Sequence, residues 1–310
     1  MRIVLHSGTA AGVTGALQAA LSQARPQLSA ARWLYPEGLG AGGQGDLLMA
    51  ALPLGEPHPL AAARGLDDPV DLQDFALGAR MRLLRQIVVQ RPRVLVLSLP
   101  EAALWCDDAA RLGALYRMLA DLSDDIAVVL HLAHPAEALA DAFATQVALG
   151  RMAGLGAEAA LADSPAGWWA AASAARAGAK PSARPARHPA LALPSPAPDG
   201  AGLAALWAGV FGADAVLARE VAPQADGAPL PQALLDDLCL PVALPPPPMA
   251  APRRPAPATL ARALRLNRAL DEGDFGPLPM ALRDPMLAAL GQAGAGLAAK
   301  DMAGFTARIR

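Results

Sequence analysis

Short apolar runs that alternate with helix-like stretches constrain the fold more than any other feature of this sequence. Ile3–Leu5, Arg93–Ser98 and Ile126–Leu132 are rich in Val, Ile and Leu. The last two are nearly continuous apolar runs, typical of strands that are buried on both faces of a parallel sheet. Stretches rich in Ala and Leu follow or separate them, at residues 13–24, 72–90, 107–122 and 136–151. This alternation predicts an α/β fold in which a parallel sheet lies between two layers of flanking helices.

The rest of the chain continues this pattern, with two interruptions. Residues 163–198 are dominated by Pro, Ala, Arg and Ser, which predicts a disordered or lid-like insertion. Residues 241–257 form a Pro-rich loop, because proline removes backbone donors and breaks helices. We expect a single domain over residues 1–310. Its other elements are strands at 31–35 and 215–219 and helices at 46–52, 203–211, 230–238, 259–270 and 284–298.

Composition argues against several classes of function. Charged residues make up 17% of the chain and the formal net charge is -2, so we expect no nucleic-acid partner. Cys106 and Cys239 lack the spacing of a zinc site, so we expect no metal. No apolar stretch is long enough to span a membrane, and the apolar run before His6 is too short for a signal peptide. These features predict a cytoplasmic protein without a membrane span.

The segment after the first strand, His6–Gln18, is rich in Gly, Ser and Thr. Such a segment, placed between a strand and a helix, can present backbone N–H groups to a phosphate or sulfate. It does not match the P-loop pattern, because no GK[ST] occurs and no lysine precedes Lys180. An ordinary turn that closes the strand is the alternative interpretation.

The spacing of this segment resembles a known loop. His6-x-Gly8-Thr9, followed by Thr14 and Leu17-Gln18, is similar to the 5′-phosphosulfate loop of bacterial sulfotransferases, commonly written HxGTxKTGTTSLQ. The resemblance covers about two-thirds of the chain in pattern and order. It implies a P-loop NTPase-like sulfotransferase fold that transfers a sulfuryl group from 3′-phosphoadenylyl sulfate (PAPS) to a hydroxyl of a small molecule or glycan. The donor-binding residues would be Ser7, Gly8, Thr9, Gly12, Thr14 and His134.

The chain departs from the family at the positions that would hold the donor's charge. The loop lysine falls on Ala11, and the Thr-Gly pair after it falls on Gly12-Val13. In the second phosphate loop the arginine falls on Ala133 and the serine on Asp141, whose carboxylate would repel a phosphate. Basic residues elsewhere could substitute for these groups: Arg151, Arg176, Arg184 and Arg187.

Two functions therefore remain open. Sulfuryl transfer needs a base for the acceptor's proton, and the candidates are Glu101, His6 and His134, each of which could instead be an ordinary surface residue. The alternative is a catalytically inactive pseudo-sulfotransferase that acts as a binding or assembly module. A third motif, Gly38–Gly43, fits the GxGxxG pattern of dinucleotide sites, but it does not follow the first strand.

Overall fold

The computed structural model describes residues 1–40, 43–52, 58–66, 68–180, 188–222, 230–245 and 257–272. The chain divides into two compact units. Unit 1 comprises Met1–Pro53, Gln73–His134 and Gly200–Arg253, and unit 2 comprises Leu54–Leu72, Pro135–Asp199 and Arg254–Arg310. The single domain expected over residues 1–310 stays a prediction.

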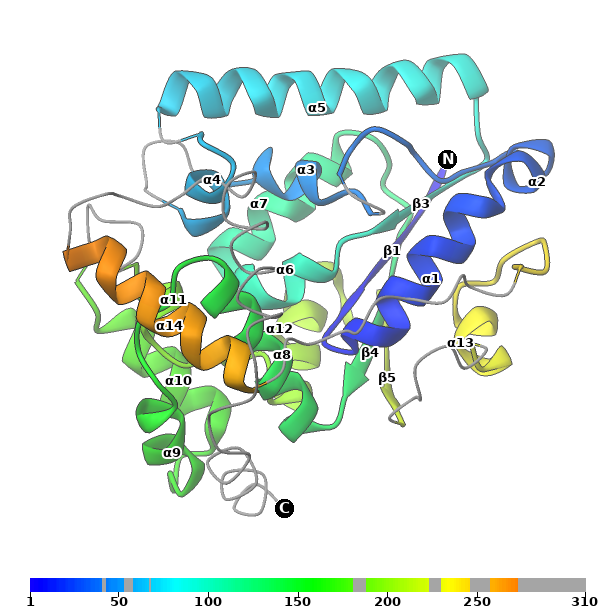
Figure 1. Cartoon of the computed structure of the whole chain (residues 1–310). Coiled ribbons are helices and arrows are strands. Elements are labelled where there is room, and N and C mark those ends of the chain that lie inside the picture. The colour runs from blue at the N-terminus through cyan, green and yellow to red at the C-terminus, as the bar shows by residue number, and fades with distance from the viewer. Residues whose placement is uncertain are drawn as a thin grey trace. The chain divides into compact units, whose positions relative to one another are not determined.

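Unit 1 contains a parallel five-stranded sheet. Figure 1 labels four of its strands, β1, β3, β4 and β5. The strand order is β2-β3-β1-β4-β5. The central strand β1 is almost entirely buried, as expected for a short apolar strand covered on both faces. The prediction of an α/β fold with a parallel sheet is confirmed. The strands are β1 (Arg2–Gly8), β2 (Trp33–Leu34), β3 (Val94–Ser98), β4 (Ile126–Ala133) and β5 (Val216–Val221).

Alternate side chains of the sheet pack against different helices. On one face, Val4, Val96 and Val129 join a core with Leu17 and Leu28. These two leucines come from α1 (Ala11–Gln23) and α2 (Arg25–Ala30), and α13 (Gln232–Asp237) is followed by Leu238 of the same core.

The opposite face of the sheet is covered by later helices of unit 1. Leu132 packs closely against Gly200, the first residue of α12 (Gly200–Phe211). This helix also contacts β5, η2 (Ala213–Ala215) and α7 (Ala109–Ala120), while α6 (Pro100–Trp105) contacts β1 and α3 (Gly45–Met49). Flanking helices therefore enclose the sheet on both faces.

Two element boundaries differ from the sequence prediction in ways that matter for the site. Helix α1 begins at Ala11, so only Thr9 and Ala10 separate it from β1. The helix expected at 107–122 begins at Ala109, because the Asp108 side chain accepts a hydrogen bond from the Arg111 N–H and caps the helix.

The helix expected at 284–298 lies outside the described residues. Among the helices of the described part, none is both long and apolar enough to span a membrane.

Unit 2 is helical in its described parts. Helices α8 (Pro135–Ala148) and α14 (Pro257–Glu272) share an apolar core that includes Phe143, Val147 and Leu260. The remaining helices of the unit are α4 (Pro59–Ala63), α9 (Gly156–Ala162), α10 (Trp168–Ala177) and α11 (Pro189–Ala192). The last two fall within residues 163–198, so this segment contains regular helix, and its role as a lid stays a prediction.

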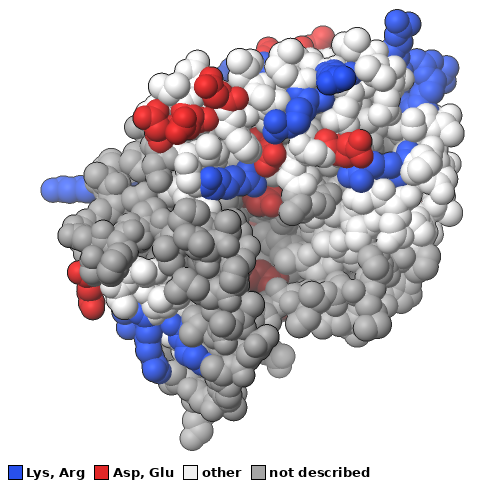
Figure 2. Space-filling model, turned by 45° about the horizontal axis from the view of Figure 1, so that its top comes forward, with Lys and Arg blue, Asp and Glu red and all other residues white. Residues whose placement is uncertain are grey.

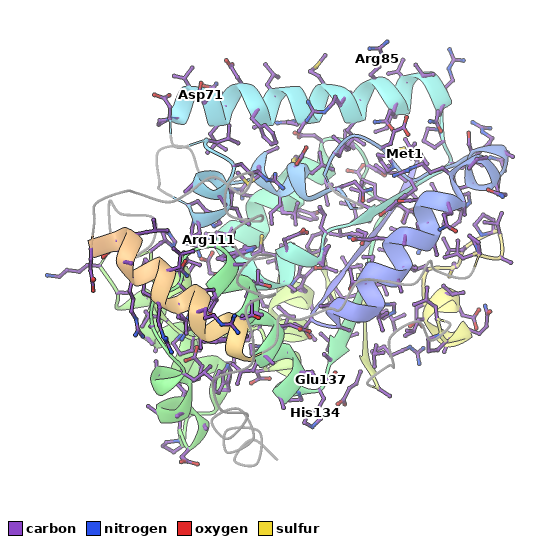
Figure 3. All side chains as sticks on the ribbon, viewed as in Figure 1. Met1, Asp71, Arg85, Arg111, His134 and Glu137 are labelled. Atoms are coloured by element: carbon purple, nitrogen blue, oxygen red, sulfur yellow. The ribbon has the colours of Figure 1, made fainter. Side chains whose placement is uncertain are left out.

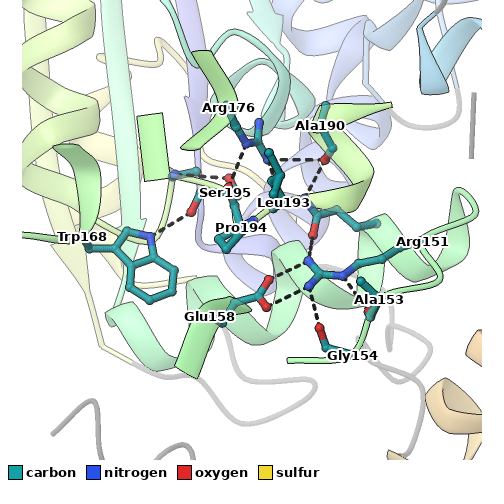
Figure 4. Close-up of polar contacts among 12 residues, drawn as sticks. Arg151, Ala153, Gly154, Glu158, Trp168, Arg176, Ala190, Leu193, Pro194 and Ser195 are labelled. Carbon is teal, nitrogen blue, oxygen red and sulfur yellow. Dashed lines mark hydrogen bonds and ion pairs between the residues drawn. The ribbon is translucent and has the colours of Figure 1, made fainter. Parts of the chain in front are cut away.

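A buried arginine organises the polar interior of unit 2 (Figure 4). Arg151 is fully buried and ion-paired with Glu158, with 2.6 Å between Nη1 and Oε1. Its guanidinium also donates to the Gln146 side chain and to the main-chain oxygens of Ala153 and Gly154. Arg176 similarly donates to main-chain oxygens, with 2.8 Å from its Nε to Pro194 O. The buried Arg151 and the half-buried Arg176 therefore both satisfy main-chain oxygens of the unit itself.

In unit 1, the end of β1 lies unusually close to β4. Gly8 has a φ of +133°, and a Cβ at this position would lie 2.1 Å from the carbonyl oxygen of His131. Real side chains do not fit at that distance. Only glycine allows β1 to run directly into the short turn at Thr9-Ala10.

We predict that Gly8→Ala lowers the free energy of unfolding by more than about 3 kcal/mol, because the new methyl group must displace the β4 backbone. Gly15→Ala is the matched control, since nothing lies within 4 Å of its Cβ position on α1. The control should gain about 0.5–1 kcal/mol through helix propensity. Urea unfolding of both variants measures the difference, and equal stabilities would contradict the close approach.

Candidate functional site

The carboxyl ends of β1, β3 and β4 are where ligands bind in open parallel sheets. In the observed register His6 lies beside Ser98 on one neighbouring strand and Val129 on the other, and Gly8 lies beside His131. Polar side chains from separate parts of the sequence therefore meet at this edge. We take this edge as the candidate functional site.

The segment predicted to hold the donor is closed onto β4. The backbone N–H groups of Thr9 and Ala10 both donate to the carbonyl oxygen of His131, at 3.0 and 3.1 Å. The Thr9 hydroxyl accepts from the Ala133 N–H at 3.0 Å, and the Ser7 hydroxyl donates to Leu99 O at 2.8 Å. The groups expected to bind a phosphosulfate are thus bonded to the chain itself.

The structure does not gather the other predicted residues into one cluster. Gly12 is half-buried in the first turn of α1, and Thr14 is buried with no hydrogen-bond partner for its Oγ1 among the described residues. Glu101 is half-buried in the first turn of α6, and His134 is half-buried directly after β4. The Glu101 charge lies close enough to Tyr35 to affect it: burial raises the pKa of Tyr35 to about 12, and the Glu101 charge adds to this shift.

A chain of hydrogen bonds that the sequence did not predict crosses the site. His6 Nδ1 lies 3.0 Å from Ser98 Oγ, and His6 Nε2 lies 3.1 Å from His131 Nδ1. His131 Nε2 lies 3.4 Å from Asp237 Oδ2, on α13. The Asp237 carboxylate in turn accepts from Arg219 Nε at 2.5 Å and Nη2 at 2.6 Å. His6, Ser98 and His131 are fully buried.

The Asp237 carboxylate sets the direction of every hydrogen bond in the series from Asp237 to Ser98. Because an ionised carboxylate can only accept, His131 donates from Nε2 and its neutral ring accepts at Nδ1. His6 must then donate from Nε2 and accept at Nδ1, so the Ser98 hydroxyl donates to His6. The Ser98 oxygen is left to accept from Gln18 Nε2 at 3.1 Å. One assignment of protons therefore satisfies every member.

The pKa values of the buried groups agree with this assignment. Burial lowers the pKa of His6 to about 3, with a further contribution from His131. Burial also lowers the pKa of His131, although its hydrogen bond to Asp237 opposes that effect. Burial alone would raise the pKa of Asp237, but its hydrogen bonds with Arg219 and His131 hold it below the usual value. Near pH 7 both imidazoles are neutral and Asp237 is charged.

Gln18 and Gln44 connect this series of hydrogen bonds to the loop after β2. Gln44 Oε1 accepts from the Ser98 N–H at 2.7 Å, and Gln44 Nε2 donates to Pro36 O at 3.1 Å. Gly43 is packed tightly beside this contact, since a Cβ there would lie 2.3 Å from Gln18 Nε2. The described part of the GxGxxG segment therefore packs against the chain of hydrogen bonds. Ala41 and Gly42 lie outside the described residues.

The order Ser98, His6, His131, Asp237 places a hydroxyl beside a base that is oriented by a carboxylate, as in nucleophilic catalysis. The hydroxyl, however, is fully buried and cannot meet a substrate in this conformation. These hydrogen bonds connect the carboxyl ends of β3, β1 and β4. Sequence analysis identified His6 but not its partners, although a polar residue near the end of each apolar strand was the available signal.

Comparisons with known proteins add no relative. No protein-family model, curated protein or solved structure matches the chain. Within the described ranges, no group of three or more His, Cys, Asp or Glu residues is placed to hold a metal ion. The resemblance to sulfotransferases therefore depends on the motif residues alone.

We predict that the buried neutral His6 makes the protein less stable in mild acid. The unfolded chain protonates His6 near its ordinary pKa of 6.5, whereas the folded chain does so only near pH 3. Stability from this residue is therefore complete above pH 6.5 and is lost as the pH falls toward 3. Between pH 7.5 and 5.0 the loss amounts to about 2 kcal/mol.

Urea unfolding of the wild type and of His6→Gln, each at pH 7.5 and 5.0, measures this effect. The glutamine variant is less stable at both values, but its pH dependence should be smaller by about 2 kcal/mol, because glutamine does not titrate. Equal pH dependence in the two proteins would show that His6 is not held neutral in the folded state.

Proposed function

We propose that the protein is a pseudo-sulfotransferase: a chain that keeps a sulfotransferase-like loop but does not bind the sulfuryl donor, and acts as a binding or assembly module. The observation that carries this proposal is the closed turn after β1. Both N–H groups of Thr9 and Ala10 are used by the carbonyl oxygen of His131. A donor phosphate would have to break these bonds before the loop could hold it.

The cations that a doubly charged phosphate needs are also missing from the matching positions. Ala11 stands where the family's loop lysine stands, and Ala133, at the end of β4, stands at the arginine position. Each charge-assisted hydrogen bond to a phosphate contributes about 1.5–3 kcal/mol. Loss of both therefore weakens binding by several orders of magnitude.

The substitute arginines named from the sequence have other partners. Arg151 is fully buried, paired with Glu158 and bonded to main-chain oxygens, and Arg176 donates to main-chain oxygens of residues 190–194. Removing Arg151 from its partners would leave the buried Glu158 carboxylate without its cation. Arg184 and Arg187 lie outside the described residues.

The described residues therefore do not fit the donor. The hydroxyl of Ser7 and the N–H groups of Thr9 and Ala10 already have partners, and His6 is fully buried and neutral near pH 7. We assign no step of sulfuryl transfer to this site. Thr14 Oγ1 has no hydrogen-bond partner among the described residues, but Thr14 is buried, so its hydroxyl is not exposed to a donor either.

Isothermal titration calorimetry with 3′-phosphoadenosine 5′-phosphate tests the proposal. We expect no binding tighter than about 0.1 mM, because the closed turn and the two alanines leave few groups for the phosphates. A dissociation constant below about 1 µM would overturn the proposal and favour an active sulfotransferase.

The double variant Ala11→Lys, Ala133→Arg separates the two reasons for weak binding. If charge alone is missing, the variant should bind at least about 100-fold more tightly than the wild type. If the closed turn prevents binding, the variant remains inert. Since Ala133 is buried, circular dichroism must first show that the variant is folded.

A further inference from the structure

Helix α5 (Pro69–Gln90) carries a row of exposed apolar side chains on its outer side. The helix packs against the protein through Leu72, Ala79 and Leu83, which are buried. The exposed side chains lie on the opposite side of the helix, about half a turn away. They are Val70, Leu77, Met81, Leu84 and Val88, with exposed fractions of 63%, 58%, 56%, 38% and 69%. We call these five residues the outer stripe.

The outer stripe follows a heptad repeat. Val70, Leu77 and Leu84 are seven residues apart, and Met81 and Val88 occupy the second apolar position of the same heptads. Alternating steps of four and three residues form the seam through which two helices pack in a coiled coil. Asp74 occupies the remaining seam position near the start of the helix. Figure 1 shows α5 as one long helix.

A second row of residues beside the outer stripe carries an acidic residue at one end and a basic residue at the other, so two antiparallel copies of it have complementary charges. Asp71, Gly78 and Arg85 are each seven residues apart and therefore lie on one flank of the seam. Figure 3 shows Asp71 and Arg85 near opposite ends of α5. Neither has an ion-pair partner among the described residues, whereas Arg80 pairs with Asp121 and Arg82 with Asp46.

Figure 2 shows both acidic and basic side chains on the face that is turned forward. Along α5 itself, Asp71 and Asp74 lie toward the first end, and Arg80, Arg82 and Arg85 lie toward the other. When a second copy of α5 runs in the opposite direction, the acidic end of each helix meets the basic end of the other. A two-fold axis near Gly78 places Asp71 of one copy beside Arg85 of the other, twice. The same axis pairs Leu77 with Met81 and Val70 with Val88, so one symmetry operation matches both rows.

We propose that the protein forms a homodimer in which the outer stripes of two α5 helices pack antiparallel across a two-fold axis near Gly78. The glycine suits this position, because the absence of a side chain lets two backbones approach closely where the helices cross. In a parallel arrangement the flanks that carry Asp71 and Arg85 would lie on opposite sides of the seam, so Asp71 of one copy could not meet Arg85 of the other. The inference uses no residue of the candidate site and does not depend on the proposed function.

Sedimentation velocity on the full chain tests whether the dimer forms. We expect a dimer at about 10 µM for the wild type and a folded monomer for Met81→Glu, which places a charge in the seam. A wild type that remains monomeric at about 100 µM would refute the proposal.

Charge reversal tests the antiparallel pairing. Asp71→Arg and Arg85→Asp should each raise the dimer dissociation constant by about tenfold or more, because each places two pairs of like charges across the axis. The double variant restores the opposite charges and should return the constant to near the wild-type value. Arg2→Asp is the matched control, because Arg2 is an exposed arginine whose ion pair lies outside α5. Failure of the double variant to recover would contradict the assigned pairing.

The direction of the helices can be measured independently. Spin labels on Val89→Cys, in a chain whose exposed Cys239 is replaced by serine, report the distance between copies. Antiparallel packing places the two helix positions about 30 Å apart along the axis, whereas parallel packing places them side by side. A short distance in a stable dimer would overturn the antiparallel arrangement, and an unrelated interface would leave Met81→Glu dimeric.

Discussion

The charge of Asp237 determines how the polar interior of unit 1 is arranged. This carboxylate accepts from Arg219 and His131, and the hydrogen bonds then run in one direction through His6 to Ser98. His6, Ser98 and His131 are fully buried away from water, so each must find a partner within the protein. Residues of four strands and of α13 thus satisfy one another, and the carboxyl edge of the sheet is closed.

The same closure is the basis of our proposal that the protein is a binding module and not a transferase. A donor site needs N–H groups and cations that have no other partner until the ligand arrives, whereas Thr9 and Ala10 already donate to β4. Unit 2 shows a similar use of charge, since Arg151 is satisfied by Glu158 and by the backbone. In both units the buried polar groups stabilise the chain's own fold.

The outer stripe of α5 shows what a periodic pattern reveals and what it leaves open. The heptad spacing of Leu77, Met81, Leu84 and Val88 is visible in the sequence, but residues such as Leu83 and Ile87 give the helix a second apolar side. Only the packed structure shows that Leu83 faces the core while the stripe is exposed. Because the outer stripe is exposed, this face of α5 is a candidate surface for association with another molecule.

Local sequence determined the elements: apolar runs predicted β1, β3 and β4, and Ala- and Leu-rich stretches predicted the helices between them, because both signals depend on near neighbours. It also identified His6 and the Gly8-Thr9 turn. The tertiary structure alone decided that His6 meets Ser98 and His131, residues 92 and 125 positions away. Strand order and register create those contacts, and neither is encoded in the local pattern of the residues that meet.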